Sequence, residues 1–360
     1  MKKLLSWITA LAMVLTLASV AMIVAGADAD GDYNPGDIAV IHAIIENNGL
    51  AWPLCPYADG DLSSEPNWME ENWPGVEWSE DVADKRIVGL RLFNRRLYGT
   101  LDVSALTNLE LLNCSLGNLS ALDLSGLTNL RFLYCNGNNL TSLDLSGLTK
   151  LEKLDCGGNN LTSLDLSGLT KLEELWCDSN NLTSLDLSGL TKLEYLYCYF
   201  NNLIALNLPG LTDLIWLDCS GNSLTSLDVS GLINLQYLSC ADNSLTALDL
   251  SGLTALVYVN VSKNYLTSQD PVLGVDEIPA FGGWDNGRFI FSPQNQRGDA
   301  DCNGTVNAAD AAAVLRHLVR LTILTDRGLQ NAKVTGGSAP VSAADAAKIL
   351  RWLVRLEAEL

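Results

Sequence analysis

The sequence contains few basic residues, since 22 Lys and Arg stand against 42 Asp and Glu in 360 residues. The formal net charge is -20 at pH 7. A surface that binds the phosphates of nucleic acid has to be basic, so nucleic acid is disfavoured as a partner. An acidic surface suits solubility and calcium binding better.

Histidine is also scarce, because only His42 and His317 are present. Both lie in segments with helical apolar spacing, and neither has a nucleophile or a set of metal ligands close in sequence. Histidine-based catalysis is therefore not indicated. A glycosidase-type carboxylate pair is the alternative. The modules described below fill the chain after residue 29 and leave no space for a catalytic domain, so we expect no enzyme.

Long apolar runs are absent after residue 24. At the N-terminus, Lys2 and Lys3 precede the apolar stretch Leu4–Val24, and small residues continue to Ala29. This order predicts a secretory signal peptide over residues 1–29. An uncleaved membrane anchor is the alternative, because the stretch is long enough to span a bilayer. We expect a secreted protein that is associated with an extracellular scaffold or a cell surface.

Nine cysteines in an exported chain would ordinarily suggest disulfides. Two of them, Cys55 and Cys302, have irregular positions, and we predict no bond between them. The other seven recur at intervals of 21 residues, as Cys114, Cys135, Cys156, Cys177, Cys198, Cys219 and Cys240. A fixed interval marks a repeat position, so we predict that these seven are small buried apolar residues.

The segment from Leu106 to Gly252 consists of seven 21-residue units, and an eighth breaks at Gln269. One unit cannot bury its leucines alone, whereas stacked units share a continuous core. We therefore predict a solenoid over residues 85–270 with a parallel sheet on its concave side. The L-x-x-L-x-x-L-x-C-x-x-N pattern resembles the leucine-rich-repeat family in its short bacterial form, which implies an α/β horseshoe with caps at both ends.

Other repeat positions carry further predictions. Asparagine recurs from Asn138 to Asn264, where an amide can satisfy backbone groups of each turn, and Gly117 takes this place in the first unit. Apolar pairs such as Leu164 and Leu166 predict a second short extended segment per coil. An acidic column is interpreted as a solvated strip helped by turn hydrogen bonds, with a cation-binding ladder as the alternative. Its members are Asp123, Asp144, Asp165, Asp186, Asp228 and Asp249.

Residues that alternate with the core leucines should point outward on the concave sheet. Nine of them are aromatic, although aromatics make up only 7% of the chain. They are Phe132, Tyr134, Trp176, Tyr195, Tyr197, Tyr199, Trp216, Tyr237 and Tyr258. Exposed aromatics are typical of binding surfaces, and flat rings can stack on sugars. The alternative is that they are simply favourable strand residues. We predict that this face binds a polysaccharide or an extended protein.

We predict that the segments on either side of the repeat form its caps. Residues 30–84 are acidic and Trp-rich, with helical apolar spacing from Asp37 to Asn47. The stretch from Trp73 to Val76 resembles the N-terminal cap of plant-type leucine-rich-repeat proteins. Residues 271–297 are predicted to form a C-terminal cap and linker, with a small hairpin around Asp285-Asn-Gly287.

A twelve-residue calcium-loop spacing begins at Asp299, with Gly304 at the sixth position, where the chain must turn sharply. The predicted Ca²⁺ ligands are Asp299, Asp301, Asn303, Thr305 (through its carbonyl), Asn307 and Asp310. The segment from Asp310 to Leu321 recurs 35 residues later as Asp345 to Leu356, but the second loop lacks the early acids. We predict one well-formed calcium site and a second that is weak or empty.

These paired halves resemble dockerin modules, which attach secreted proteins of cellulose degraders to cohesin domains of cellulosome scaffolds. The resemblance covers residues 298–360 and implies a small all-α domain. It implies cohesin contacts at Ala308, Ala309, Arg316, Arg320, Ala343, Ala344, Arg351 and Arg355. Four leucines could equally contact the cohesin or pack between the helices, namely Leu315, Leu318, Leu350 and Leu353.

These features together predict a secreted binding protein that is attached to a scaffold through cohesin and that presents an aromatic face to polysaccharide. A protein-interaction or adhesion module on the same scaffold is the alternative. An atypical carbohydrate-active enzyme is the third hypothesis.

Overall fold

The computed structural model describes most of the repeat region and parts of its flanks. The described residues are 33–56, 68–81, 84–266, 272–278, 288–291, 299, 306, 308–318, 331 and 341–353. The predicted signal peptide and most of the predicted calcium loop lie outside them. The chain divides into two compact units, of which the first holds Met1–Asn202 and Pro209–Leu214 and the second holds the rest. Within the described ranges, no helix has the length and apolarity needed to cross a bilayer.

Helix α2 (Pro35–Asn48) forms the N-terminal cap of the first unit, in the region where helical spacing predicts it. Asn34 starts the helix, because its side-chain oxygen accepts the N–H groups of Gly36 and Asp37 at 2.9 and 3.2 Å. Gly49 ends it in the left-handed conformation, at φ 60°. The isoleucine side chains of the helix are buried, so its apolar face covers the first coil.

A buried ion pair fastens this cap to the sheet. The Asp37 carboxylate accepts two hydrogen bonds from the Arg86 guanidinium at 3.1 and 2.9 Å, and the N–H of Ile87 at 2.7 Å. Three donors compensate for the burial of this charge. Helix α3 (Trp68–Asn72) leads to Trp73, which is fully buried and donates its indole N–H to the Pro53 carbonyl at 2.8 Å.

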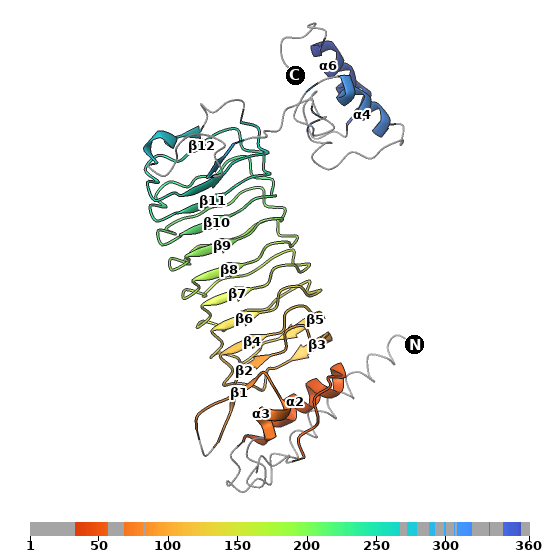
Figure 1. Ribbon diagram of the computed structural model, residues 1–360, viewed down its shortest axis with the longest axis vertical. Coiled ribbons are helices and arrows are strands. Elements are labelled where there is room, and N and C mark those ends of the chain that lie inside the picture. The colour runs from red at the N-terminus through yellow and green to blue at the C-terminus, as the bar shows by residue number, and fades with distance from the viewer. Residues whose placement is uncertain are drawn as a thin grey trace. The chain divides into compact units, whose positions relative to one another are not determined.

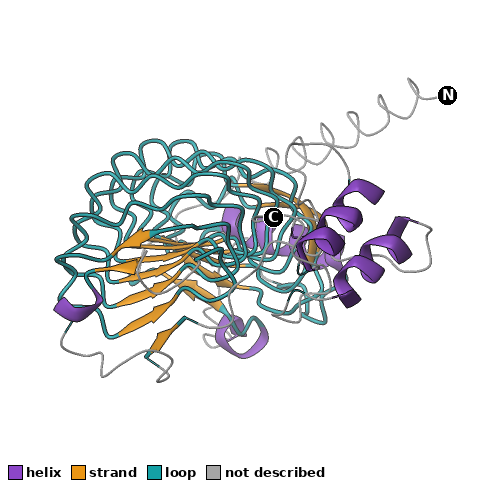
Figure 2. Ribbon diagram, turned by 90° about the horizontal axis from the view of Figure 1, so that it is seen from above, coloured by secondary structure: helices purple, strands orange, loops and turns teal. Residues whose placement is uncertain are grey.

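The first unit is built on a sheet whose strand order is β1-β2-β4-β6-β7-β8-β9. Strand β1 (Val76–Trp78) is antiparallel to β2, and the others are parallel to their neighbours. The bounds are β2 (Ile87–Arg91), β4 (Leu111–Asn113), β6 (Phe132–Tyr134), β7 (Lys153–Asp155), β8 (Glu174–Trp176) and β9 (Tyr195–Tyr197). In each three-residue strand the middle leucine is buried and its two neighbours are partly exposed. Figures 1 and 2 show these short strands following one another along one side of the coils.

The opposite side of the coils carries few hydrogen-bonded strands in the described part of the chain. Strands pair there only near the ends of the repeat, as β3 (Tyr98–Asp102) with β5 (Asn118–Asp123) and β12 (Leu248–Asp249) with β14 (Val272–Leu273). In the described coils between them, Leu164, Leu166 and their equivalents are buried without forming strands. The alternating apolar pattern therefore indicated side-chain burial and not a backbone ladder.

A column of asparagine amides joins successive coils. Asn180 accepts the N–H of Leu161 at 2.9 Å and donates to the carbonyls of Cys156 and Cys177 at 3.0 and 3.2 Å. The same pattern recurs at Asn138, Asn159, Asn201, Asn243 and Asn264. Gly117 takes this place in the first unit, where a Cβ atom would lie 2.7 Å from the Asn138 side-chain oxygen, and the column begins one coil later.

The second unit carries the strand order β10-β11-β13-β15, all parallel. The bounds are β10 (Trp216–Asp218), β11 (Tyr237–Ser239), β13 (Tyr258–Asn260) and β15 (Phe289–Ile290), and a short 3₁₀ helix η1 spans Val275–Glu277. Phe289 is fully buried, so it covers the last coil as a C-terminal cap would. It does so from a parallel strand beside β13, and the other half of the predicted hairpin lies outside the described residues.

Helices α4 (Ala308–Leu318) and α6 (Ala343–Leu353) pack on each other in the segment with the 35-residue pseudo-repeat. They share an apolar cluster composed of Ala311, Ala313, Val314, Val341, Ala346 and Ile349. Leu315 is 44% exposed, so it lies outside this core. The side chains of Leu318, Leu350 and Leu353 are not among those described.

Candidate binding face

We call the nine outward aromatics the aromatic face. Six of them lie in the first unit and three in the second. All nine are partly exposed, at positions that flank buried leucines, valine or cysteines. This position separates them from the core and makes them available to a ligand.

The three rings of the second unit form a stack. Trp216 and Tyr237 have centroids 3.6 Å apart at 6°, and Tyr237 and Tyr258 are 4.2 Å apart at 4°. Because the three residues occupy paired positions on neighbouring strands, the ring faces are turned toward one another across the strands. Both faces of Tyr237 are therefore covered, and the ring edges are what the surface presents.

Rings of the first unit are arranged more loosely. Trp176 and Tyr197 are nearly parallel, at 9° and 5.6 Å, and the Arg131 guanidinium lies 5.0 Å from the centre of the Phe132 ring. Phe200 packs against Tyr199 at 5.5 Å and remains 60% exposed. Its φ is 50°, a conformation that costs a bulky residue about 1–2 kcal/mol. Sequence reasoning missed Phe200, although glycine occupies the equivalent position in three other units, as Gly137, Gly158 and Gly221.

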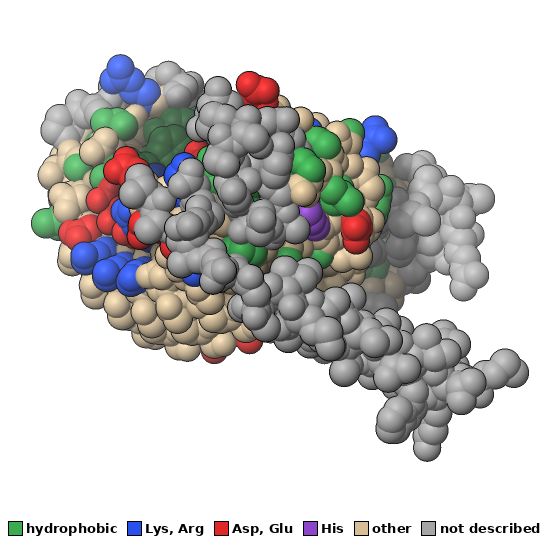
Figure 3. All heavy atoms as spheres, turned by 90° about the horizontal axis from the view of Figure 1, so that it is seen from below, with side chains coloured by type: hydrophobic (Ala, Val, Ile, Leu, Met, Phe, Trp, Pro, Cys, Tyr) green, Lys and Arg blue, Asp and Glu red, His purple; other side chains and the backbone are tan. Residues whose placement is uncertain are grey.

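Ion pairs run alongside the rings. Arg131 donates to the Glu152 carboxylate through two bonds of 2.9 and 2.8 Å, and Lys153 pairs with Glu174 on the next strand. Seen from below, acidic and basic side chains lie close together (Figure 3). Asp155 differs, because burial raises its pKa to about 6 and the nearby Asp178 charge adds to the shift.

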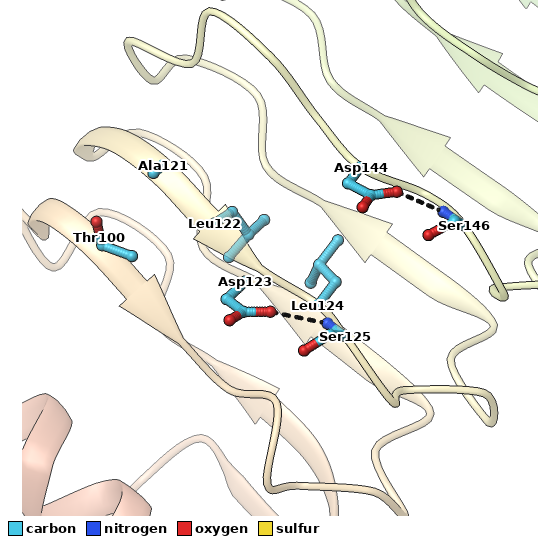
Figure 4. A pocket seen from close by; sticks show the side chains of 8 residues that line it. All are labelled: Thr100, Ala121, Leu122, Asp123, Leu124, Ser125, Asp144 and Ser146. Carbon is cyan, nitrogen blue, oxygen red and sulfur yellow. Dashed lines mark hydrogen bonds between the residues drawn. The ribbon is translucent and has the colours of Figure 1, made fainter. Parts of the chain in front are cut away.

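The acidic column lies at turns. The side chains of Asp123 and Asp144 accept the N–H groups of Ser125 and Ser146 at 3.0 and 2.9 Å (Figure 4). These two turns line a hollow of about 270 Å³. The serine N–H and hydroxyl groups lower the pKa of Asp144 below its ordinary value. These hydrogen bonds explain why an aspartate recurs once per unit at this position, since each carboxylate accepts the N–H of the serine two residues later and completes its own turn.

The repeat cysteines form no disulfide bonds and are fully buried. Burial raises the pKa of Cys114 and of Cys240 to about 12, so these thiols stay protonated and unreactive. Cys55 is also buried and forms no disulfide bond with a described residue, and Cys302 lies outside the described residues. His42 accepts the Cys55 N–H at 2.9 Å, and burial lowers its pKa, which gives it a structural role.

Two of the six predicted calcium ligands lie among the described residues, and both are buried: Asp299 is 2% exposed and Asp310 is 0% exposed. The other four are Asp301, Asn303, Thr305 and Asn307. In the second half, Asp345 accepts the N–H and hydroxyl of Ser342 at 2.8 and 2.9 Å, which caps α6. Within the described residues, no three His, Cys, Asp or Glu side chains form a group that could hold a metal.

The predicted cohesin contacts are partly described. Ala309 and Ala344 are exposed at equivalent positions of α4 and α6. The side chains of the remaining predicted contacts lie outside the description, and these are Ala308, Arg316, Arg320, Ala343, Arg351 and Arg355.

Comparisons with known proteins show which proteins the repeat region resembles. Residues 128–170 and 170–213 match the family described as Leucine Rich repeats (2 copies). The functional domain of InlJ from Listeria monocytogenes, which includes a cysteine ladder, is 38% identical over 49% of this chain and 42% of that chain, with a TM-score of 0.46. A leucine-rich-repeat protein of Leptospira interrogans is 25% identical over 45% of each chain, with a TM-score of 0.44.

A third solved structure extends the likeness in fold. The ectodomain of the Arabidopsis thaliana receptor kinase GASSHO1/SCHENGEN3, in complex with CASPARIAN STRIP INTEGRITY FACTOR 2, is 24% identical, with a TM-score of 0.50. The likeness covers 63% of this chain and 30% of that chain, so this chain spans less than half of each of these three structures. No curated protein matches the sequence. The repeat region of this chain is a solenoid of stacked repeats, of which residues 128–213 match the leucine-rich-repeat family.

Proposed function

We propose that this chain is a non-catalytic binding protein whose aromatic face binds an extended protein partner. The observation that carries the proposal is the set of partly exposed aromatic residues that flank buried core residues, on β6, β8 and β9 of the first unit and on β10, β11 and β13 of the second. Tyrosine and tryptophan present apolar area together with a polar group, and both are enriched at protein interfaces.

Ring orientation in the second unit favours a protein over a polysaccharide. A sugar that stacks on an aromatic residue needs an open ring face. The spacings of 3.6 and 4.2 Å in the second unit leave no space between the rings, and the Arg131 guanidinium lies over Phe132. Ring edges and hydroxyl groups instead suit hydrogen bonds and side-chain contacts with a protein surface.

Polysaccharide is the second candidate, supported by the aromatic enrichment of the face. The two candidates separate on a glycan array and an array of purified extracellular proteins, both probed with the full chain. Binding to a protein that weakens at least tenfold in Tyr197→Ala supports the proposal. Binding to glycans alone, lost in Trp176→Ala, would replace it with the polysaccharide function. Release of products from a glycan would contradict the non-catalytic role.

We also propose secretion and attachment through the C-terminal helices to a cohesin domain, with one Ca²⁺ in the first loop. The buried carboxylates of Asp299 and Asp310, at the first and last loop positions, are the donor type that calcium prefers, so these residues fit the ion. Asp345 caps its helix instead, which suits an empty second loop. The test is cohesin binding by wild type and Asp310→Asn, with and without a chelator. Equal binding in all four conditions would exclude this mode of attachment.

A further inference from the structure

Two carboxylates lie close together in the first unit: Asp155 is the last residue of β7, and Asp178 lies two residues after the end of β8. Burial and the Asp178 charge act on Asp155 together. At Gly157, a Cβ atom would lie 2.7 Å from the Asp178 side-chain oxygen, so Asp178 leans across the position where Gly157 has no side chain. The Asp155 side chain accepts the N–H of the same Gly157 at 3.2 Å, so both carboxylates lie beside this residue.

Aromatic rings flank these acids on both sides. In the parallel register, Asp155 pairs with Tyr134 on one neighbouring strand and with Trp176 on the other. The Trp176 ring stacks on Tyr197, which belongs to the strand beyond it. Its other face is consequently turned toward the strand that carries Asp155.

The charged groups around Asp155 leave this place negative. Lys153 is paired with Glu174, so its charge is already balanced within the sheet. The buried thiols of Cys135 and Cys156 below have raised pKa values and are neutral. The Tyr134 hydroxyl also stays neutral, because burial raises its pKa. Among the described residues, no basic side chain forms an ion pair with Asp155 or Asp178.

We propose that Asp155, Asp178, Tyr134 and Trp176 form a subsite for an arginine side chain of the protein partner. A guanidinium is planar, donates to two carboxylates at once and stacks on an indole face, so it matches both the acids and the rings. Its charge also complements the pair of carboxylates that the sheet leaves unbalanced. This inference rests on the proposed function and names the partner chemistry that one part of the face recognises.

The test is an NMR titration of the full chain, with the Gly157 amide and the Trp176 indole as reporters. The probes are Nα-acetyl-arginine amide and the citrulline analogue, which has the same shape without the charge. Arginine is expected to shift both signals and to bind at least tenfold more tightly than citrulline. The Asp155→Asn variant keeps an oxygen for the Gly157 N–H, which lies 3.2 Å from Asp155, and is expected to weaken arginine binding at least fivefold.

The matched control is Asp144→Asn, which removes one charge from an exposed turn and keeps the oxygen that accepts the Ser146 N–H. Its arginine affinity is expected to stay within twofold of wild type. Equal affinity for arginine and citrulline, or equal effects of the two variants, would overturn the subsite. Tighter binding of the capped lysine analogue, or of calcium chloride alone, would also overturn it.

Failure of the subsite is distinguishable from failure of the proposed function. If Tyr237→Ala abolishes binding of the protein partner but the wild-type chain does not bind Nα-acetyl-arginine amide, the face binds a protein and the subsite is wrong. If arginine binds as expected, but Tyr197→Ala and Tyr237→Ala leave the affinity for the protein partner unchanged, the subsite is correct and the proposed function is wrong.

Discussion

The substitution Asn180→Ala tests most directly how the asparagine column joins the coils. Asn180 is 7% exposed, so water has little access to the groups that the substitution would strip of partners. The amide accepts one hydrogen bond, from Leu161 at 2.9 Å, and donates to three carbonyls, those of Cys156, Cys177 and Asp178, at 3.0, 3.2 and 3.1 Å.

The magnitude follows from what remains buried. A buried donor or acceptor without a partner costs about 1–3 kcal/mol. Asn180→Ala leaves the buried Leu161 N–H without an acceptor, whereas the Cys156 and Cys177 carbonyls keep the amide donors of Asn159 and Asn201. One orphaned donor and the lost hydrogen bonds to the carbonyls together predict a loss of about 2–4 kcal/mol. Natural domains have roughly 5–15 kcal/mol in total, so such a loss removes a large part of the margin.

The assay is equilibrium unfolding in guanidinium chloride, followed by far-UV circular dichroism. Asn181→Ala is the matched control, because this neighbouring asparagine is exposed, and we expect it to cost less than about 0.5 kcal/mol. A loss in Asn180→Ala within about 1 kcal/mol of the control would refute the role assigned to the column.

Three further predictions concern the thiols, the acid pair and the N-terminal cap. The seven repeat thiols should not react with a thiol reagent in the native protein and should all react after unfolding; fast native reaction would contradict their burial. Asp155→Asn should raise the unfolding free energy by about 1–3 kcal/mol at pH 8 and by much less at pH 4. The sign follows because the folded pKa of Asp155, about 6, is above its unfolded value, so wild-type stability is lost as pH rises through 6. A thermal melt at both pH values checks this, and equal effects at the two would refute it. Asp37→Ala leaves Arg86 and the Ile87 N–H without their acceptor and should cost about 3–5 kcal/mol, seen as easier proteolysis of the cap; unchanged cleavage would count against the ion pair as its fastening.

The sequence was informative wherever a residue recurred at a fixed position. The 21-residue period was enough to predict stacked coils, buried cysteines and asparagine amides that serve the turns, because stacking places equivalent residues in equivalent surroundings. Leu164 and Leu166 show the limit of this reasoning. The alternation of apolar residues there correctly indicated that the Leu164 and Leu166 side chains are buried. Strand pairing depends in addition on how neighbouring backbones approach each other.

The orientation of the side chains could not be predicted from the sequence. The list of outward aromatics was predictable, but the stacking of Trp216, Tyr237 and Tyr258 depends on rotamers and strand spacing. The raised pKa of Asp155 likewise arises from burial and from Asp178, which lies on a different coil. The four calcium-loop residues outside the described ranges and the signal peptide remain predictions.

The central claim is that the aromatic face binds a protein partner, and the most direct measurement is the affinity of that partner for two matched variants. Tyr237→Ala removes the middle ring of the stack, whereas Tyr98→Ala removes an exposed ring from β3, outside the face. We expect at least a tenfold loss of affinity for Tyr237→Ala and less than a twofold change for Tyr98→Ala. Equal affinities for the two variants would contradict it.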